Sequence, residues 1–498
     1  MQTLLSKTSR DANRPATTVH IVAEMTKEAE KRGTVRSAGR TVIALAMMGG
    51  LLSSVLSSLP VAQAAVDSIP TASGNVATRW VERSFDAVRS GNPSLHTTTP
   101  GAARTYAMTT AAMYDAVNGI DVAAGRSTRG RALVASYDGA PAGGSPDAAA
   151  SAAAHAVLAS LFASNAPVKD SLDRAHAAEL AALGSDPSVE AGRSWGAAVG
   201  SEVLAIRSGD GTQSGSSQPG GNGPGVFPRT FGATQFRNMT PFGVTSIAGY
   251  LSSGPPDLTS AEYAEAFNEV KTLGSFTDTD PERAAIARHW LAEGGTVKES
   301  GLWFKVALNV IDEQGTAASL PETTRLLALL GMGIADSVTT TWSDKFTFHY
   351  WRPGDAIRQA STDGNPATEE DPSWNPRGGI CSATSVPFCS VFGGTPEHTS
   401  GTSMFAGSAS TILANFYCTD RIRFSFMNES GSSVRTYDTF SEAAREAGRS
   451  RIYGGIHFQF SNVAGRAAGK EIGRKIVRTR LLDVEPAASS GRCKSTPA

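Results

Sequence analysis

Three segments in the C-terminal half of the chain carry side chains that could hold one oxyanion between them. The first runs from Lys345 to Arg352, the second from Thr395 to Thr402 and the third from Arg451 to His457. The lysine and the two arginines supply positive charge and directed hydrogen-bond donors, and His457 supplies a nitrogen that can bond a central atom. This set predicts a site for phosphate or for a metal oxyanion.

The first segment is predicted to be a helix over 343–352. Lys345 and Arg352 are seven residues apart, almost two helical turns, so both side chains would leave from one face. Pro353 would end that helix. The plainer alternative is a solvated face with two cations, but the four aromatic residues between them favour a buried helix, where unpaired cations are costly.

The second and third segments can each contribute donors through a helix end or a turn. Ser400 and Gly401 stand at the predicted start of a helix over 400–416, where free amides and the helix dipole favour an anion, although an ordinary serine N-cap explains the same residues. Arg451 and His457 are six apart and share no helical face. The intervening Gly454-Gly455 allows a turn that directs both inward, although a lone histidine is more often a core residue.

The elements that must position these residues are almost all helices. The chain has 498 residues, 40% of them hydrophobic, and a formal net charge of −1, which argues against nucleic-acid binding. Apolar residues at three- and four-residue intervals predict an all-α fold, and no useful alternating β run is seen. The family resemblance described below implies that these helices form two four-helix-bundle-like halves. The predicted helices cover 77–90, 102–118, 146–164, 168–184, 189–207, 259–273, 280–295, 299–313, 321–341, 343–352, 400–416, 438–449 and 455–479.

The division of the chain follows from composition. Residues 1–64 have the arginine-rich start, the apolar run and the small-residue cleavage site of a signal peptide, with Met25 as a second candidate start and a membrane anchor as the alternative. The expected N-terminal half is 65–228, closed by a Gly/Ser/Pro-rich linker at 208–228. A C-terminal half over 229–480 carries the site, and 481–498 is a tail. The loop between Pro353 and Gly394 is expected to wall the site.

Export makes disulfides possible for the four cysteines of the mature chain. Of the three possible pairings, Cys381 with Cys389 and Cys418 with Cys493 is favoured, because it closes a short loop and staples the tail. The cysteine spacing does not resemble a zinc site.

In order and separation, the K-x6-RP, SG and SR-x5-H segments resemble those of the vanadium-dependent haloperoxidases, which share their site with the type 2 phosphatidic acid phosphatases and the bacterial acid phosphatases. The segments Ala107–Asn118 and 323–340 also resemble helices of the bacterial branch, so that the likeness covers most of residues 75–480. The resemblance implies a vanadate cofactor bound by Lys345, Arg352, Ser400, Gly401, Arg451 and His457, with His457 bonding vanadium.

The resemblance also implies a reaction. Hydrogen peroxide, polarised by Lys345, would oxidise a halide that halogenates a small organic acceptor, while vanadium acts as a Lewis acid. Trp342 falls where some members place an aromatic residue near the halide. The expected protein is secreted, has no stable membrane association after cleavage, and is a monomer or a homodimer.

Two positions depart from the family pattern. Thr402 replaces the usual acid-base histidine, and a threonine cannot store a proton near neutral pH, so His398 is the only nearby imidazole substitute. Ser461 replaces the carboxylate that family members often carry four residues after His457, where it can orient the imidazole. Asp344 or Asp355 could orient the imidazole in its place.

Two alternatives therefore stay open beside a haloperoxidase. The first is an acid phosphatase with His457 as nucleophile. The second is an oxyanion-binding homologue whose turnover is altered or lost.

Overall fold

The computed structural model describes residues 74–292, 295–377 and 393–483. These residues belong to the second of two compact units, which begins at Pro70. The predicted signal peptide, Cys381, Cys389, Cys493 and most of the predicted tail lie outside the described residues. No helix in the described ranges has the length and apolar character needed to cross a membrane.

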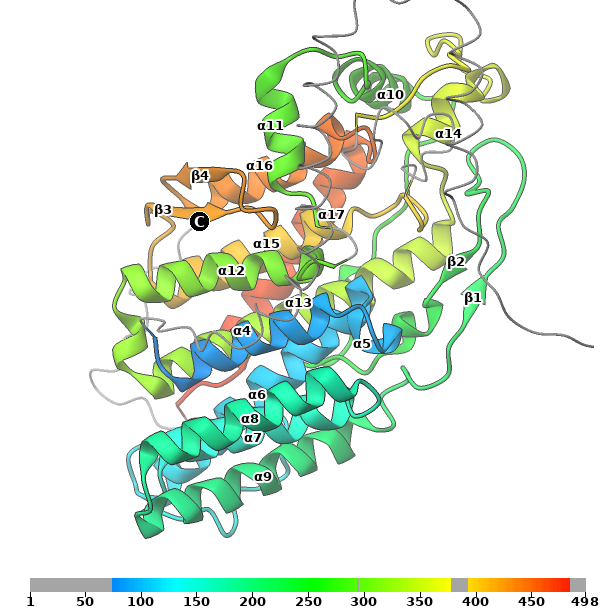
Figure 1. Cartoon of the computed structure of the whole chain (residues 1–498). Helices are drawn as coiled ribbons and strands as arrows, with labels where there is room; N and C mark the ends of the chain where they lie inside the picture. The colour runs from blue at the N-terminus through cyan, green and yellow to red at the C-terminus, as the bar shows by residue number, and fades with distance from the viewer. Residues whose placement is uncertain (1–73, 293–294, 378–392, 484–498) are drawn as a thin grey trace, which may run out of the picture. The chain divides into compact units, whose positions relative to one another are not determined.

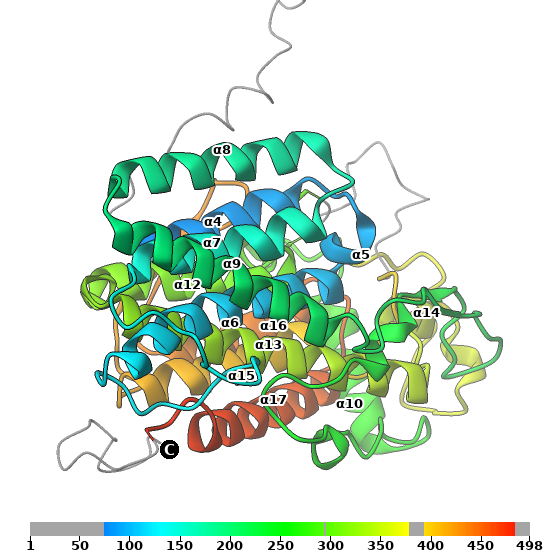
Figure 2. The ribbon, with the colours of Figure 1, turned by 90° about the horizontal axis from the view of Figure 1, so that it is seen from below.

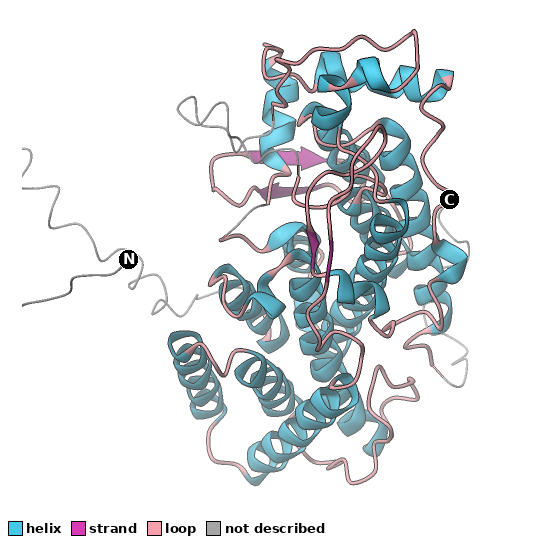
Figure 3. Cartoon of the chain, turned by 90° about the vertical axis from the view of Figure 1, so that its right-hand side faces the viewer, coloured by secondary structure: helices cyan, strands magenta, loops and turns pink. Residues whose placement is uncertain are grey.

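The described residues are mostly helical, as the sequence predicts (Figure 3). The helices that precede the Gly/Ser-rich segment 208–228 are α4 (Val76–Arg89), α5 (Ser94–Thr97), α6 (Thr99–Ala123), α7 (Pro146–Leu161), α8 (Ala166–Leu183) and α9 (Pro187–Arg207). Helices α7, α8 and α9 lie together at one end of the unit (Figure 1). Small residues let them pack closely, since a Cβ atom on Gly196 of α9 would clash with the Ala149 carbonyl of α7.

The second group of helices surrounds the long helix α13 (Leu320–Phe348), which packs on α6 and on α15 (Gly401–Phe416). Its other members are α10 (Ala261–Leu273), α11 (Pro281–His289), α12 (Lys298–Glu313), α14 (Pro353–Arg358), α16 (Phe440–Tyr453) and α17 (Gln459–Thr479). Helix α15 packs most extensively on α17, where Gly465 and Gly469 meet the carbonyls of Ser400 and Met404. Figure 2 shows α17 along one side of this group, with α13 beside α15.

Two small antiparallel sheets complete the fold. Strand β1 (Ser217–Gln218) pairs with β2 (Phe231–Gly232), and β3 (Phe424–Met427) pairs with β4 (Val434–Tyr437). The hairpin β3–β4 was not predicted, because each strand is only four residues long. It is held by burial of Phe424, Phe426 and Tyr437 against the main core.

The predicted helix over 343–352 is wrong. Helix α13 runs without a break through 342 and ends at Phe348, where His349 takes a left-handed conformation with φ of 45°. Arg352 is extended and is the N-cap residue of α14, so Lys345 and Arg352 do not share a helical face. Helix α11 also ends at His289, six residues before its predicted end.

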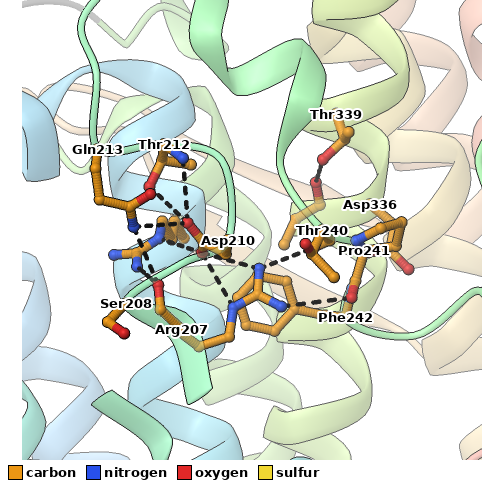
Figure 4. A network of polar contacts seen from close by, with 12 residues as sticks. Arg207, Ser208, Asp210, Thr212, Gln213, Thr240, Pro241, Phe242, Asp336 and Thr339 are labelled. Carbon is orange, nitrogen blue, oxygen red and sulfur yellow. Dashed lines mark hydrogen bonds and ion pairs between the residues drawn. The ribbon is translucent and has the colours of Figure 1, made fainter. Parts of the chain in front are cut away.

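A buried charge network joins the two groups of helices (Figure 4). Asp210 accepts hydrogen bonds from Arg104 of α6 at 2.7 Å and from Arg207 of α9 at 3.1 Å. Arg207 also donates to the Thr240 carbonyl at 2.6 Å and lies over the ring of Phe242. The amide of Phe242 donates in turn to Asp336 of α13 at 2.6 Å, so the network leads from α6 to the helix that carries Lys345.

Candidate functional site

One cavity of about 670 Å³ brings the three predicted segments together. Most of the predicted site residues line it, namely Trp342, Lys345, Arg352, Gly401, Thr402, Arg451 and His457. Gly393 and Gly394, the last residues of the predicted loop, line the same cavity together with Thr395, while residues 378–392 of that loop lie outside the described residues. The cations come from three different elements: α13, the start of α14 and the last turn of α16.

Lys345 lies in the last turn of α13 and is almost completely buried. Its ammonium group donates to the carbonyl of Pro396 and, at 3.0 Å, to the carbonyl of Glu397. Burial and the neighbouring Arg352 hold the pKa of Lys345 well below its ordinary value, because a second positive charge disfavours the protonated amine. A bound anion would offset that repulsion.

The guanidinium of Arg352 is fixed by four acceptors. It donates to the Thr395 carbonyl at 2.8 Å, the Thr395 hydroxyl at 2.9 Å, the Ile456 carbonyl at 2.7 Å and Nε2 of His457 at 2.9 Å. Burial lowers the pKa of Arg352 to about 10. Gly393, with φ of 79°, packs directly on this group, where a Cβ atom would lie 2.8 Å from Cζ.

Helix α15 begins at the cavity. Ser400 is its N-cap, and the serine hydroxyl accepts from the amide of Ser403 at 3.4 Å, as an ordinary capping residue does. Ser400 is fully buried behind the lining residues, whereas Gly401 and Thr402 line the cavity. The first turn of α15 therefore faces the cations and favours an anion there.

A turn after α16 places His457 beside Arg451. Arg451 is in the last turn of α16, Gly454 caps that helix, and Gly455 has φ of 75°. The amides of Ile456 and His457 donate back to the Arg451 carbonyl at 3.1 and 3.3 Å. The glycine pair thus provides the predicted turn.

A carboxylate that the sequence analysis missed holds His457 from behind. Oε1 of Glu397 accepts from Nδ1 of His457 at 2.7 Å and from the Phe458 amide at 3.0 Å. Because arginine can only donate, Nε2 must present its lone pair to Arg352, so the ring is neutral and its proton lies on Nδ1. The pKa of His457 lies well below its ordinary value because the ring is buried and three cations face it.

Glu397 is itself fully buried. Burial raises its pKa to about 7, and Arg352 and Lys345 oppose that rise. The signal for this residue was present, because Glu397 is the only acid in the Thr395–Thr402 segment. Its contact with a histidine 60 residues later in the chain could not be read from spacing.

Asp344 and Asp355 were considered as carboxylates that could orient His457, and His398 as a substitute for the missing acid-base histidine. The positions of the three side chains do not support these roles. Asp344 bonds the Ser252 amide and the Thr399 hydroxyl, and Asp355 pairs with Arg229, so neither contacts His457. The ring of His398 bonds the Ser252 hydroxyl at 2.7 Å, packs beside Phe348 and Phe460, and is not among the residues that line the cavity.

Ser461 is fully buried close to Glu397, and its hydroxyl is among the groups that oppose the rise of the Glu397 pKa. Cys418 is in a disulfide whose other cysteine lies outside the described residues, which leaves the predicted pairing open.

Within the described ranges, no three His, Cys, Asp or Glu side chains are grouped to hold a metal cation.

The donor set fits a tetrahedral oxyanion. Three cations, the first turn of α15 and a neutral imidazole meet at one cavity, while the carboxylate of Glu397 stands behind the imidazole. Positive charge of this density is costly to bury alone, and an anion offsets it.

Comparison with known proteins gives the same assignment. Residues 325–482 match the family model for the second helical-bundle domain of vanadium chloroperoxidase (VCPO). The C-terminal part of the chain therefore resembles a domain of that family. The matched residues contain all three cations, His457 and Glu397.

Individual relatives in this family are distant. The chain is 26% identical to the vanadium chloroperoxidase of Curvularia inaequalis over 216 residues, which is 39% of this chain and only 34% of that protein. A bacterial vanadium-dependent iodoperoxidase has a similar structure, with a TM-score of 0.63 and 20% identity over 82% of this chain and 98% of that one. A bacterial vanadium-dependent chloroperoxidase in its apo form gives a TM-score of 0.56 and 15% identity over 77% and 93%. At these identities the solved structures establish the shared fold.

Proposed function

We propose that this haloperoxidase homologue binds vanadate and uses hydrogen peroxide to oxidise a halide, which then halogenates an organic acceptor. The observation that carries the proposal is the neutral His457 at the cation-lined cavity. Its Nδ1 proton is held by Glu397, and its Nε2 lone pair accepts a hydrogen bond from Arg352 that a bound oxyanion would replace. A nitrogen prepared in this way can bond a metal centre, and a carboxylate behind it raises its basicity.

Each residue has a part in this scheme. Lys345, Arg352 and Arg451 neutralise the oxyanion, and Gly401 offers the amide at the start of α15, with Ser400 fixing that turn. Bound vanadate supplies a Lewis acid that activates peroxide. Lys345 is placed to donate a hydrogen bond to an oxygen in the cavity, and Trp342 lines the wall where a halide can approach.

Thr402 is expected to limit the rate of this reaction. It lines the cavity where an acid-base histidine is usual, and its hydroxyl relays a proton without storing one. With His398 bonded to Ser252 outside the cavity wall, proton transfer to peroxide oxygens depends on water or on groups farther along the cavity. Slow turnover with intact oxyanion binding is therefore a second candidate, which Thr402 favours.

The decisive experiment uses the purified chain from Pro70 onward, loaded with orthovanadate. Peroxide-dependent bromination and iodination of a dione reporter are measured beside hydrolysis of an aryl phosphate. Halogenation that is lost in His457→Ala and is inhibited by phosphate supports the proposal. Phosphate release without vanadate would instead identify a phosphatase, and tight vanadate binding without either reaction would identify a homologue with lost turnover.

A gain-of-function variant separates the first candidate from the second. Thr402→His restores the usual imidazole at the start of α15, and general acid-base catalysis contributes on the order of 10²–10⁴ in rate. Halogenation should rise at least tenfold in kcat at an unchanged vanadate affinity. The proposed secretion is tested separately, by finding whether the exported protein begins near residue 65.

A further inference from the structure

Helix α17 carries a row of positive side chains along its length. The helix has five lysine and arginine residues and one acid, Glu471, whereas the whole chain has a formal net charge of −1. Four of the five recur at every fourth residue and are called the basic stripe: Arg466, Lys470, Arg474 and Arg478. Residues four apart lie above one another on a helix, so the basic stripe is about 18 Å long.

The basic stripe has few counter-charges. Glu471 pairs with Arg474, while Arg466, Lys470 and Arg478 form no ion pair with an acid of the described ranges. Burial and the neighbouring Arg445 of α16 lower the pKa of Arg466. Like charges four residues apart destabilise a helix. The stability of α17 therefore does not explain the basic stripe.

The basic stripe borders the face of α17 that packs on α15. Gly465, Gly469 and Gly473 make that packing, and a stripe residue follows each of these glycines. Helix α17 lies along one side of the described helices (Figure 2). The stripe therefore runs along the border between the two helices.

A small depression of about 30 Å³ lies at this border. Lys470 and Arg474 line it together with hydroxyl and amide side chains of α15, namely Ser410, Thr411 and Asn415. Asp420 is the one acid in the described lining, and the amide and hydroxyl of Ser441 donate to its two oxygens at 3.0 and 2.5 Å. An anion at the depression thus meets two cations and a carboxylate whose oxygens are already bonded.

Cations placed in a line fit a linear polyanion. Successive stripe residues are about 6 Å apart along the helix axis. In a polyol phosphate with three carbons per unit, six covalent bonds separate neighbouring phosphorus atoms. An extended chain spans about 3.3–3.6 Å for every three bonds, so its phosphates recur at about 7 Å. Flexible lysine and arginine side chains can meet that spacing, and each can bind one phosphate.

Two other polyanionic partners fit this surface less well. A helix that binds a membrane buries an apolar face, but Val463 is the one large apolar side chain of α17 that is exposed. Single-stranded nucleic acids stack their bases on aromatic rings, and the one aromatic ring of α17, Phe460, packs against Phe458 and His398. Duplex DNA carries a charge about every 1.7 Å, which is much denser than the stripe.

We propose that the basic stripe binds a linear polyol phosphate, a phosphodiester polymer without bases, along the border between α17 and α15. The polymer lies over Lys470 and Arg474 at the depression and reaches Arg466 and Arg478 on either side. No stripe residue belongs to the described lining of the cavity of about 670 Å³. This binding site is therefore separate from the oxyanion site, and it goes beyond the proposed function.

The test measures binding of poly(glycerol phosphate) to the purified chain by calorimetry at several salt concentrations. Each phosphate of a single-stranded polyanion adds about −0.7 to the slope of log K against log salt, so four contacts predict about −3. The triple variant Arg466→Gln/Lys470→Gln/Arg478→Gln should bring the slope to about −0.7 and weaken binding at least tenfold at low salt. Its Tm should stay unchanged or rise, because like charges are removed.

Two further variants keep the result specific to the stripe. Arg466→Lys/Arg478→Lys retains the charge and should retain the slope. The matched control is Arg131→Gln/Arg174→Gln/Arg288→Gln, which removes the same charge from exposed arginines outside α17 and should bind the polymer as wild type does. Equal slopes for wild type and the stripe variant would overturn the inference.

Competing probes decide the kind of partner. Tighter binding of phosphatidylglycerol vesicles, or of a DNA oligonucleotide with the same number of phosphates, would refute a polyol phosphate as the ligand. Displacement of the polymer by a small excess of orthovanadate would place it at the cavity and would also overturn the inference. Orthovanadate titration of the stripe variant should match wild type, so a failure of the proposed function appears in that titration and not in polymer binding.

Discussion

Removing the negative charge of Glu397 should weaken the binding of vanadate, which can bond to His457, but not the binding of sulfate, which is held by charge and hydrogen bonds alone. Glu397→Gln preserves the shape of the side chain, and its amide oxygen can still accept from Nδ1 of His457 and from the Phe458 amide. The variant removes the negative charge and adds an NH2 group. Because the pKa of Glu397 is about 7, the two proteins are compared at pH 8 or above. The imidazole becomes less basic, while the cavity that holds three cations becomes more positive.

The expected magnitudes differ between anions. A hydrogen bond to a charged acceptor contributes about 1.5–3 kcal/mol and a neutral one about 0.5–1.5 kcal/mol, so His457 loses about 1 kcal/mol or more of support. Loss of such a partner behind a metal-binding histidine costs about 10–100-fold in affinity. Sulfate forms no bond to nitrogen and should feel only the added positive charge, which strengthens its binding a few-fold.

The assay is a calorimetric titration of orthovanadate and of sulfate at one ionic strength, with the Tm of each variant recorded. The readout is the ratio of the two dissociation constants. Asp344→Asn is the control, because Asp344 is buried beside Lys345 and bonds Thr399 without contacting His457. If Glu397→Gln remains folded and the two affinities move together by the same factor, then Glu397 does not act through the imidazole and the reasoning fails.

Three further predictions concern the surroundings of the site. Gly393→Ala should weaken orthovanadate binding at least tenfold, because φ is 79° and the new Cβ atom displaces the guanidinium of Arg352; Gly394→Ala, with open space around it, should not. Asp210→Asn leaves buried arginines without their carboxylate and should cost about 3–5 kcal/mol in urea unfolding; a loss below 1 kcal/mol would contradict this. Burial lowers the pKa of His289 to about 4, so this residue alone should contribute a loss of about 2 kcal/mol of stability as pH falls from 7.5 to 5, through the unfolded-state value of about 6.5. His289→Gln should reduce that loss, and equal pH profiles would argue against it.

The sequence predicted where the helices occur far better than it predicted where the helices near the site begin and end. The periodic apolar residues predict α4, α6, α7, α9 and α15 to within a few residues. The end of α13 was missed because Tyr350 and Trp351 look like a buried helical face. Tertiary contacts keep this segment out of the helix, because the Trp351 amide donates instead to the Gly225 carbonyl of a distant loop at 3.1 Å.

Patterns within short stretches of chain were enough to predict the mostly helical fold and to select residues that meet at one cavity. The tertiary structure alone decided the state of His457 and the form of the cavity. Nδ1 of His457 meets a carboxylate 60 residues away, and the lining of the cavity includes Pro100 and Leu291 from distant parts of the chain. Contacts between residues far apart in the chain leave no periodic signal, so packing decides which residue becomes the partner.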